Sequence, residues 1–567
     1  KLNFFNNFLE FFFYQGLNSQ NENDFVKEIN CKVPYIGGGL FEYFEGYNWK
    51  KETLKIPNST FSNTNKDGIL DIFELYNFTV DENENIDVEI SIDPEMLGRV
   101  FENLLEENIR KKGGSFYTPR SIVNFMSEDS MINYLNNKLN DKLSYQQISS
   151  FVTDNNFDIA KDKIFKLNVL IIDSILENIK ICDPAIGSGA FAVGIVNLIS
   201  RLRVSLKNFV DRKYKNTSYY FKRHCIQNSI YGVDIDASAV EVTKLRLWLS
   251  LIVDEADYSL TEPLPNLDYK IMQGDSLIDE FYGYKFRIIE KNKKQYSLYE
   301  KPKEIENLVS ELNLLQEKYA NLKQFLKRKE IRIQIDKQLI KIFEEVMSGI
   351  DKFDQEKSKK LRKSYDIYDT KNKKRSFFCW ELFFAEVFYV KKGFDIVIAN
   401  PPYIEFKITP KSYKEKLVDY LSAKGKYDLY VIFTEKCLEL LNDDGIAILI
   451  QPTSFLKKDL GKFLRIFLEK KTEILSVHDF NDIQIFSKVT NYTGLFQFKK
   501  KKLNNYNFDY HQYFSSNESL FIKNFYESLR NKNNTGSKNF LEINSEYLKN
   551  DQWNFQTDET QNKLSLI

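Results

Sequence analysis

The chain has 567 residues, and its 80 lysines and arginines balance its 80 aspartates and glutamates. This length predicts more than one domain and large cores, and neutrality argues against a histone-like DNA coat without excluding a local basic cleft. The five scattered cysteines form no CxxC pair and there are only three histidines, so no metal site is expected. Free cysteines, no signal peptide and no apolar run that could span a bilayer favour a reducing cytoplasm and no membrane contact.

The first 110 residues mix short aromatic segments with turns and end in an amphipathic pattern. In "DPEMLGRVFENLLEENIRKK", Leu97, Val100, Phe101 and Leu104 fall at helical spacing. A nuclease of the PD-(D/E)xK type needs an acid two positions before a lysine, and no lysine in residues 1–110 has one. We therefore expect a mainly helical connector here. Because the chain starts at Lys1, we expect any nuclease domain of a longer parent chain to lie upstream.

Helix and strand patterns alternate from residue 163 onward. After a helix at residues 163–180, "IKICDPAIGSGAFAVGIVNLIS" and "SIYGVDIDASAVEVTKLRLWLSLIV" each predict a strand, a turn and a helix, and "YKIMQGDSL" and "FDIVIANPPY" predict two further strands. A helix in "DLYVIFTEKCLELL", a strand in "GIAILIQPTSFL", a helix and strand in "FLRIFLEKKTEILSVHDF" and a last strand in "TGLFQFKKKK" end the series. Such alternation predicts an α/β fold with a mostly parallel sheet that helices cover on both faces.

A long insertion, about residues 296–375, separates the third and fourth strands. Within it, residues 303–347 carry apolar residues every three or four positions with charges between them, which predicts an antiparallel helical hairpin. Basic residues cluster at 322–332 and 371–375. Such charge runs are either solvated faces or DNA contacts, and the sequence leaves both readings open.

The segment "DPAIGSGAF" (183–191) follows a short strand and opens a helix. Gly187 and Gly189 permit a tight turn and the close approach of a ligand to the backbone. The free N–H groups of the helix start suit an anionic group such as a carboxylate. The spacing is not GxGxxG and no GK[ST] follows, which disfavours a triphosphate. The alternative is a glycine-rich turn without a ligand.

Two further acids follow the next two strands. Asp234 ends the second strand, where an acid in a doubly wound fold typically binds ribose hydroxyls. Its alternative role is that of a helix N-cap, which Asp236 also suits. Asp275 in "GDSL" follows the third strand and could accept from the exocyclic amine of an adenine ring. A nucleoside that bears a small zwitterion fits these three strand ends together.

The fourth strand ends abruptly in "NPPY", from Asn400 to Tyr403. Asn400 supplies a side-chain oxygen, and the Pro401 carbonyl can supply a second acceptor. Pro401 and Pro402 fix φ and stiffen the loop, and Tyr403 offers a stacking face. Taken alone, the motif is also compatible with a strand followed by a proline-rich turn.

Together these motifs resemble a known family. "DPAIGSGAF", "GVDID", "GDSL" and "NPPY" occur in the order of the S-adenosylmethionine-dependent amino-methyltransferases of DNA, and "GGSFYTPRSIV" (113–123) resembles the first cofactor motif of the gamma-class adenine-N6 enzymes. The segments "VPYIGGGLFE", "IDPEMLGRVFENLL", "FFCWELFFAEVF" and "GKYDLYVIFTEKCLELL" are similar to the large methyltransferases of Type IIG restriction-modification systems. The resemblance covers about residues 95 to 500 and implies a Rossmann-like methyltransferase fold.

The resemblance also implies a role for each matching residue. Tyr117, Thr118 and Pro119 would enclose the methionine end of S-adenosylmethionine, and Asp183, Pro184, Gly187, Ser188 and Gly189 would line the same end. Asp234 with Ile235 would bind the ribose side, and Asp275 the cofactor's adenine. Asn400, Pro401, Pro402 and Tyr403 would hold the target base, and Phe486 in "DIQIFSKVTNYTG" would face that base from its other side. For Phe486 the alternative is ordinary core packing.

The implied function is adenine-N6 methylation of double-stranded DNA on a flipped-out base, in a prokaryotic cytoplasm. Adenine rather than cytosine rests on motif order, because both amines suit the same acceptors. Three alternatives remain: a protein-glutamine methyltransferase, which also uses NPPY but is smaller and lacks "FYTP"; a Type IIG parent chain that also cleaves DNA; and a DNA-binding module that has lost catalysis.

The expected domain boundaries follow from these motifs. Residues 1–110 form the connector, residues 111–500 form the methyltransferase domain with its insertion, and residues 505–567 form the truncated start of a target recognition domain. The lysine run Lys499–Lys502 precedes that last region. A run of exposed lysines can contact phosphate, but it is also common at strand ends.

Overall fold

The computed structural model describes residues 3–18, 24–33, 35, 49–51, 54–75, 77–78, 91–92, 118–210, 217–252, 264–281, 303–321, 325–351, 376–481, 483–486, 492–500, 503–514, 529, 538–549 and 551–555. Tyr117, the expected helix at 93–112 and the basic cluster at 371–375 lie outside these residues. No helix within the described ranges is both long enough and apolar enough to cross a membrane.

A nine-stranded sheet forms the centre of the molecule. Its strands are β5 (Ile181–Asp183), β6 (Ile230–Asp234), β7 (Ile271–Gln273), β8 (Phe394–Ala399), β9 (Leu441–Pro452), β10 (Glu473–Asp479), β11 (Thr493–Lys499), β12 (Asn507–Tyr513) and β13 (Lys538–Asn544). They lie in the order β13-β12-β10-β11-β9-β8-β5-β6-β7. The five strands from β9 to β7 are mutually parallel, whereas β11 runs antiparallel to both of its neighbours.

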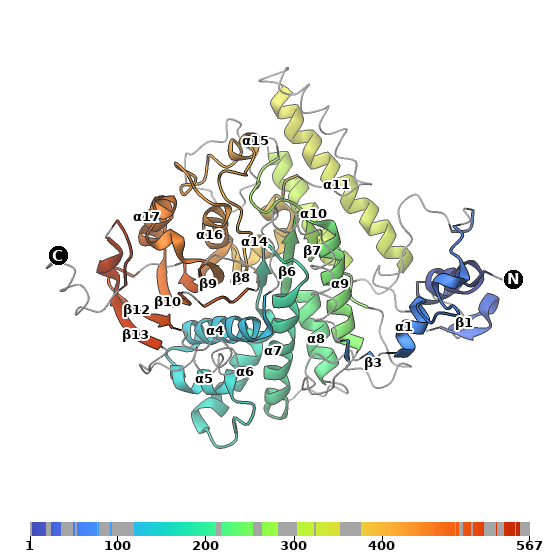
Figure 1. Cartoon of the computed structure of the whole chain (residues 1–567), viewed down its shortest axis with the longest axis horizontal. Helices are drawn as coiled ribbons and strands as arrows, with labels where there is room; N and C mark the ends of the chain where they lie inside the picture. The colour runs from blue at the N-terminus through green and yellow to red at the C-terminus, as the bar shows by residue number, and fades with distance from the viewer. Residues whose placement is uncertain are drawn as a thin grey trace.

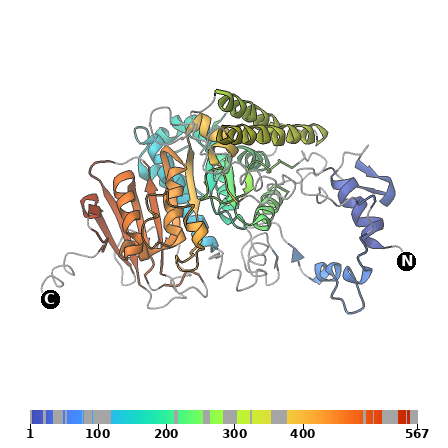
Figure 2. The same ribbon diagram turned by 90° about the horizontal axis from the view of Figure 1, so that it is seen from above.

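Helices cover both faces of this sheet, as the sequence predicted. One set of helices comprises α4 (Arg120–Leu139), α5 (Tyr145–Thr153), α6 (Lys163–Asn178), α7 (Ala190–Leu206), α8 (Thr217–Asn228) and α9 (Ala237–Ile252). The other set comprises α13 (Trp380–Phe383), α14 (Ala385–Lys391), α16 (Leu429–Glu439) and α17 (Lys462–Lys471). Figure 2 shows α4 and α17 on opposite sides of the strands. All six residues of β8 are buried, as expected for a strand covered on both faces.

The fold class is therefore the predicted one, a Rossmann-like α/β fold. Its parallel half follows from the alternation of buried strands and amphipathic helices. Short elements complete the domain: η6 (Lys207–Phe209), α15 (Lys411–Lys414), η8 (Thr453–Leu456), η9 (Asp459–Gly461) and η10 (Ser545–Lys549).

The inserted hairpin is also confirmed within the described residues. It consists of α10 (Lys303–Asn321) and α11 (Phe325–Asp351), which pack against each other beside β7 (Figure 1). The buried face of α11 includes Ile335, Leu339 and Phe343 at helical spacing, and the ring of Phe343 lies 4.2 Å from that of Phe281 in the methyltransferase core. Of the basic cluster at 322–332, Arg332 forms an ion pair with Asp268 at 3.5 Å.

The N-terminal region folds into a few short elements. These are two π-helical segments, η1 (Phe5–Leu9) and η2 (Phe11–Leu17), then β1 (Phe25–Val26), η4 (Lys27–Ile29), β2 (Cys31–Lys32), η5 (Asn58–Thr60), α1 (Ile69–Leu75), β3 (Asn77–Phe78) and β4 (Ser91–Ile92). Leu17, Val26 and Val33 form a small core that is separate from the main one.

One expectation about the sheet is wrong. The series of strands does not end at "TGLFQFKKKK", because β12 pairs in parallel with β10, and β13 pairs antiparallel with β12. Buried side chains hold β12 in place: the Tyr513 hydroxyl lies 2.9 Å from His478 Nδ1, and the Tyr510 hydroxyl donates to Asp479 at 3.1 Å. The edge of β10 thus gains a partner strand from a region that the sequence assigned to another domain.

Candidate active site

Three acids meet at one edge of the sheet. Asp183 and Asp234 are the last residues of β5 and β6, and Asp275 follows β7. Because β5, β6 and β7 are parallel neighbours, their carboxyl ends lie side by side. This edge is where doubly wound folds bind ligands.

Backbone N–H groups hold two of these acids. Asp234 accepts from Gly187 N through Oδ2 (2.8 Å) and from Asp236 N through Oδ1 (2.9 Å). Asp183 accepts from Ala185 N (3.0 Å). The side chain of Asp236, in turn, caps α9 by accepting from Ser238 N at 2.9 Å. The helix-capping role therefore falls to Asp236, and Asp234 instead links the β6 end to the glycine-rich turn.

Burial shapes the electrostatics of this edge. It raises the pKa of Asp234 to about 6, although the backbone N–H groups of Asp236 and Gly187 work in the opposite direction. Burial also raises the pKa of Asp183 well above its usual range, and the neighbouring Asp234 carboxylate adds to this rise. Burying carboxylates close together costs free energy. Carboxyl groups with strongly shifted pKa values are typical of functional sites.

The turn between β5 and α7 is rigid. Gly187 and Gly189 have φ values of 54° and 84°, which favour glycine. A Cβ on Gly189 would meet the buried Thr243 side chain at 2.7 Å. Thr243 Oγ1 donates to the Gly187 carbonyl (2.7 Å), and Arg246 Nη1 donates to the Ser188 carbonyl (2.8 Å). Helix α9 therefore fixes the turn from behind.

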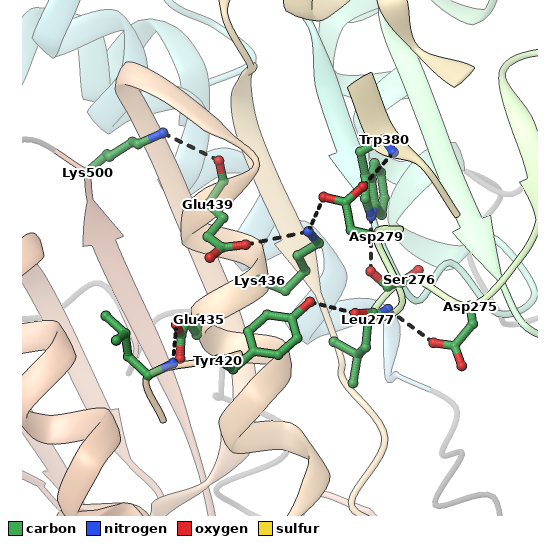
Figure 3. A network of polar contacts seen from close by, with 11 residues as sticks. Asp275, Ser276, Leu277, Asp279, Trp380, Tyr420, Glu435, Lys436, Glu439 and Lys500 are labelled. Carbon is green, nitrogen blue, oxygen red and sulfur yellow. Dashed lines mark hydrogen bonds and ion pairs between the residues drawn. The ribbon is translucent and has the colours of Figure 1, made fainter. Parts of the chain in front are cut away.

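The loop after β7 is fixed by a polar network, shown in Figure 3. The Ser276 carbonyl accepts from the Trp380 indole at 3.0 Å, and Asp279 accepts from Trp380 N at 3.0 Å. Lys436, which is 2% exposed, donates to Asp279 at 2.7 Å. Ser276 Oγ also donates to the Pro184 carbonyl (2.6 Å), which joins this loop to the glycine-rich turn. The carboxylate of Asp275 thus lies on a well-braced loop.

The loop that follows β8 holds the second half of the site. Asn400 Nδ2 donates to Thr118 Oγ1 at 3.2 Å, although the two residues are 282 positions apart. Thr118 is buried and immediately precedes Pro119, the N-cap residue of α4. The start of α4 and the end of β8 therefore meet at the side chain of Asn400. The hydrogen bond turns the amide so that its nitrogen faces Thr118.

Two aromatic rings lie together beyond this loop. Tyr403 is 8% exposed, and its hydroxyl donates to the Ile450 carbonyl at 3.1 Å. Its ring meets that of Phe486 edge to face, with centroids 6.2 Å apart. Burial raises the pKa of Tyr403 well above its usual range, so the phenol stays neutral. The structure thus brings Phe486 to the residue that it was expected to face across the target base.

The remaining predicted residues take distinct places. Pro184 and Ser188 are parts of the turn, Pro401 is buried and Pro402 is half-buried. Ile235 projects from the end of β6 and is 66% exposed, which is unusual for an isoleucine next to a buried strand. It therefore presents an apolar surface next to the acid edge.

Sequence patterns did not indicate several residues that the site uses. Thr243 and Arg246 brace the turn from α9, and the Tyr413 hydroxyl donates to Asp275 at 3.0 Å. These side chains lie on ordinary helical or loop segments, and only the tertiary fold brings them to the site. No spacing rule would have selected them.

A polar cavity of about 280 Å³ lies elsewhere, between α4, α5 and strands β10 to β12. Its lining includes Asp129, His478, Gln497 and His511 and none of the predicted site residues. Among the described residues, no group of three or more His, Cys, Asp or Glu side chains is arranged to hold a metal ion.

Comparison with known proteins shows which proteins this chain resembles. Residues 228–486 match the model of the Eco57I restriction-modification methylase family. A candidate type II restriction enzyme and methyltransferase of Methanocaldococcus jannaschii is 28% identical over 517 residues, which cover 80% of this chain and 41% of that protein. The type II restriction enzyme and methyltransferase RM.Eco57I of Escherichia coli is 23% identical over 374 residues, covering 62% of this chain and 28% of that protein.

This chain therefore spans less than half the length of these two curated relatives. Among solved structures, the type IIL restriction-modification enzyme MmeI in complex with DNA aligns with a TM-score of 0.49 and 14% identity, over 89% of this chain and 50% of that one. The sequence matches confirm the resemblance to the methyltransferase part of type II restriction-modification enzymes. Residues 228–486, from the end of α8 to Phe486, are similar to the Eco57I restriction-modification methylase family.

Proposed function

We propose that this protein transfers a methyl group from S-adenosylmethionine to the N6 amine of a flipped-out adenine in double-stranded DNA. The observation that carries the proposal is the juxtaposition of Asn400 and its proline loop with an edge of buried acids, in a chain whose residues 228–486 match the Eco57I methylase family. The parallel order of β8, β5, β6 and β7 accounts for that juxtaposition.

The acid edge fits S-adenosylmethionine. A Cβ on Gly187 would meet only the Ala185 carbonyl, at 4.0 Å, so a ligand can approach the backbone closely there. Asp234 offers acceptors for ribose hydroxyls and Asp275 for an adenine amine. The exposed Ile235 offers an apolar surface for the adenine ring. Thr118, Pro119, Asp183, Pro184, Gly187 and Ser188 would surround the methionine end, together with Tyr117, which lies outside the described residues.

The bound cofactor supplies a sulfonium methyl group, which is already electrophilic, so the protein needs no metal or strong base. The task of the protein is to improve a poor nucleophile, because the lone pair of an exocyclic amine is conjugated into its ring. Asn400 Oδ1 and the Pro401 carbonyl would accept the two amine protons and favour a pyramidal nitrogen. Preorganised acceptors of this kind act through orientation and matched electrostatics.

Thr118 supports this role of Asn400. Its hydroxyl accepts from Nδ2 at 3.2 Å. The opposite end, Oδ1, is then the end that meets the target amine. With the amide reversed, the Nδ2 group of Asn400 would face the target amine, and two hydrogen-bond donors would oppose each other.

The aromatic pair would receive the base. Tyr403 and Phe486 contact each other edge to face, so a base stacked between them requires the rings to separate. The hydroxyl of Tyr403 donates to the Ile450 carbonyl of β9, which holds that ring in place. A base can reach this place only after leaving the duplex.

Two alternatives keep the same chemistry. The relatives are named as both restriction enzymes and methyltransferases, which favours a parent chain that also cleaves DNA. A protein-glutamine methyltransferase also needs a planar nitrogen held by NPPY, but the family match argues for DNA as the substrate.

The direct test is methyl transfer from labelled S-adenosylmethionine to unmethylated genomic DNA, followed by nucleoside analysis. N6-methyl-2′-deoxyadenosine in the DNA digest is the expected product, and the variant Asn400→Ala serves as the blank. Label in N4-methylcytosine would refute adenine as the target. Label only in an added glutamine-containing protein substrate would refute DNA methylation.

A further inference from the structure

The segment from 404 to 428 leaves the Asn400–Tyr403 loop and crosses to the loop after β7. Two tyrosines make the connection. The Tyr413 hydroxyl, in α15, donates to Asp275 Oδ1 at 3.0 Å, and the Tyr420 hydroxyl donates to the Leu277 carbonyl at 2.7 Å. Figure 3 shows Tyr420, Leu277 and Asp275 in this arrangement. Only the first of these bonds engages the carboxylate.

The two oxygens of Asp275 differ in their surroundings. Oδ1 accepts from Leu277 N at 3.1 Å as well as from Tyr413. Two donors from different parts of the chain thus fix the rotation of a carboxylate that is 6% exposed. Its other oxygen, Oδ2, is the one that a ligand amine would meet.

We propose that Tyr413 is a positioning residue for the cofactor: it holds Oδ1 of Asp275 so that Oδ2 is presented to the adenine amine. This inference rests on the proposed function, because it takes Asp275 as the acceptor of that amine. It also gives the segment after the target-base loop a direct contact with the cofactor pocket. Substitution of Tyr413 should therefore lower the affinity for the cofactor and leave the rate of methyl transfer at saturating cofactor largely unchanged.

The charge state of Asp275 depends on the same contact. Burial raises the pKa of Asp275, while the Leu277 N–H, the Tyr413 hydroxyl and the Lys416 ammonium oppose this rise. Tyr420 also faces this carboxylate, and its own pKa is raised mainly by burial. Removing the Tyr413 hydroxyl raises the pKa of Asp275 further, so the carboxylate is lost at a higher pH as the solution is acidified.

The test compares Tyr413→Phe with Tyr420→Phe. Each variant removes one hydroxyl from the same segment, and only the first removes a bond to the carboxylate. Binding of S-adenosylmethionine is measured by calorimetry from pH 5 to 8, without DNA, and melting temperatures are recorded for both variants. We expect Tyr413→Phe to weaken binding about tenfold and to move the acid limb of the binding curve to higher pH. Tyr420→Phe should keep the wild-type affinity and acid limb.

Each contrary outcome has a clear meaning. Unchanged or tighter binding by Tyr413→Phe overturns the proposal, since tighter binding shows that Tyr413 occupies the place of the amine. Equal losses of affinity in both variants also overturn the proposal, because the two hydroxyls then act only by holding the segment against the loop after β7. The variant Asp275→Asn distinguishes a failure of the Tyr413 proposal from a failure of the proposed function. If the wild type does not bind S-adenosylmethionine, or Asp275→Asn binds as the wild type does, the cofactor assignment itself fails.

Discussion

The acid edge and the target-base loop are built in opposite ways. At the acid edge, Asp183 and Asp234 each accept from the backbone N–H two residues farther along the chain. At the target-base loop, Asn400 depends on Thr118, and Tyr403 depends on Ile450 and Phe486. One half of the site starts from local turns, to which Gly187 and Tyr413 add distant donors, and the other half is held by the distant contacts just named. A local motif is visible in sequence, whereas an assembled one is visible only after folding.

The two halves also differ in charge. The acid edge carries carboxylates whose pKa values are raised by burial, whereas the target-base loop carries an amide and a phenol that stays neutral. Binding and transfer should therefore respond differently to mutation and to pH.

The largest effect is expected from Asp234→Asn. This change puts an amide where two backbone N–H groups and the ribose hydroxyls need acceptors, and it should weaken S-adenosylmethionine binding about 100-fold. The matched control is Asp236→Asn, since asparagine caps a helix as well as aspartate does and this side chain only accepts from Ser238 N. Calorimetry on both variants checks the prediction. Equal losses would mean that the β6 turn, and not the carboxylate of Asp234, holds the cofactor.

The next effect concerns the stability of the glycine-rich turn. Gly189→Ala combines a φ of 84° with a contact to Thr243 at 2.7 Å and should lower the free energy of unfolding by about 2 kcal/mol. Gly425→Ala has a φ of 73° but meets nothing within 4 Å, so it should cost about 1 kcal/mol. Urea titration of both variants measures the difference. If the two losses are equal, the close packing of α9 behind the turn adds nothing.

A smaller effect is expected from Thr118→Val, which keeps the shape of the side chain and removes its hydroxyl. The amide of Asn400 then loses its orienting partner, so the transfer rate at saturating cofactor should fall about tenfold. Thr118→Ser restores the hydroxyl and should restore most of the rate. Rates come from single-turnover assays and affinities from calorimetry. If the affinity for the cofactor falls and the transfer rate does not, Thr118 contributes only to cofactor binding and does not orient Asn400.

The smallest effect is the pH dependence of the wild type. Because burial raises the pKa of Asp234 to about 6, the carboxylate is protonated as the pH falls through that value, and cofactor affinity should decline a few-fold between about pH 7 and 5. The rate at saturating cofactor should change less, since neither Asn400 nor neutral Tyr403 titrates there. Calorimetry and rate measurements over one pH series test this. A flat affinity through pH 6 would contradict the role of Asp234.

The same contrast explains how much the sequence predicted. Strand ends, glycine positions and the parallel sheet followed from patterns within about ten residues, and the structure confirms them. The pairing of β12 with β10 was missed, although Phe508 and Tyr510 alternate with polar residues, because residues 505–567 were assigned to a separate target recognition domain. Tyr413, Thr243 and the partnership of Thr118 with Asn400 depend on long-range packing, for which one sequence holds no signal.

The central claim is that binding and transfer reside in separate halves of the site. Its most direct test follows labelled S-adenosylmethionine through Asn400→Ala, with binding measured by calorimetry and transfer to unmethylated DNA measured in a single turnover. We predict an affinity within about twofold of the wild type and a transfer rate at least about 100-fold lower. Transfer at the wild-type rate, or an affinity that falls together with the rate, would contradict the account.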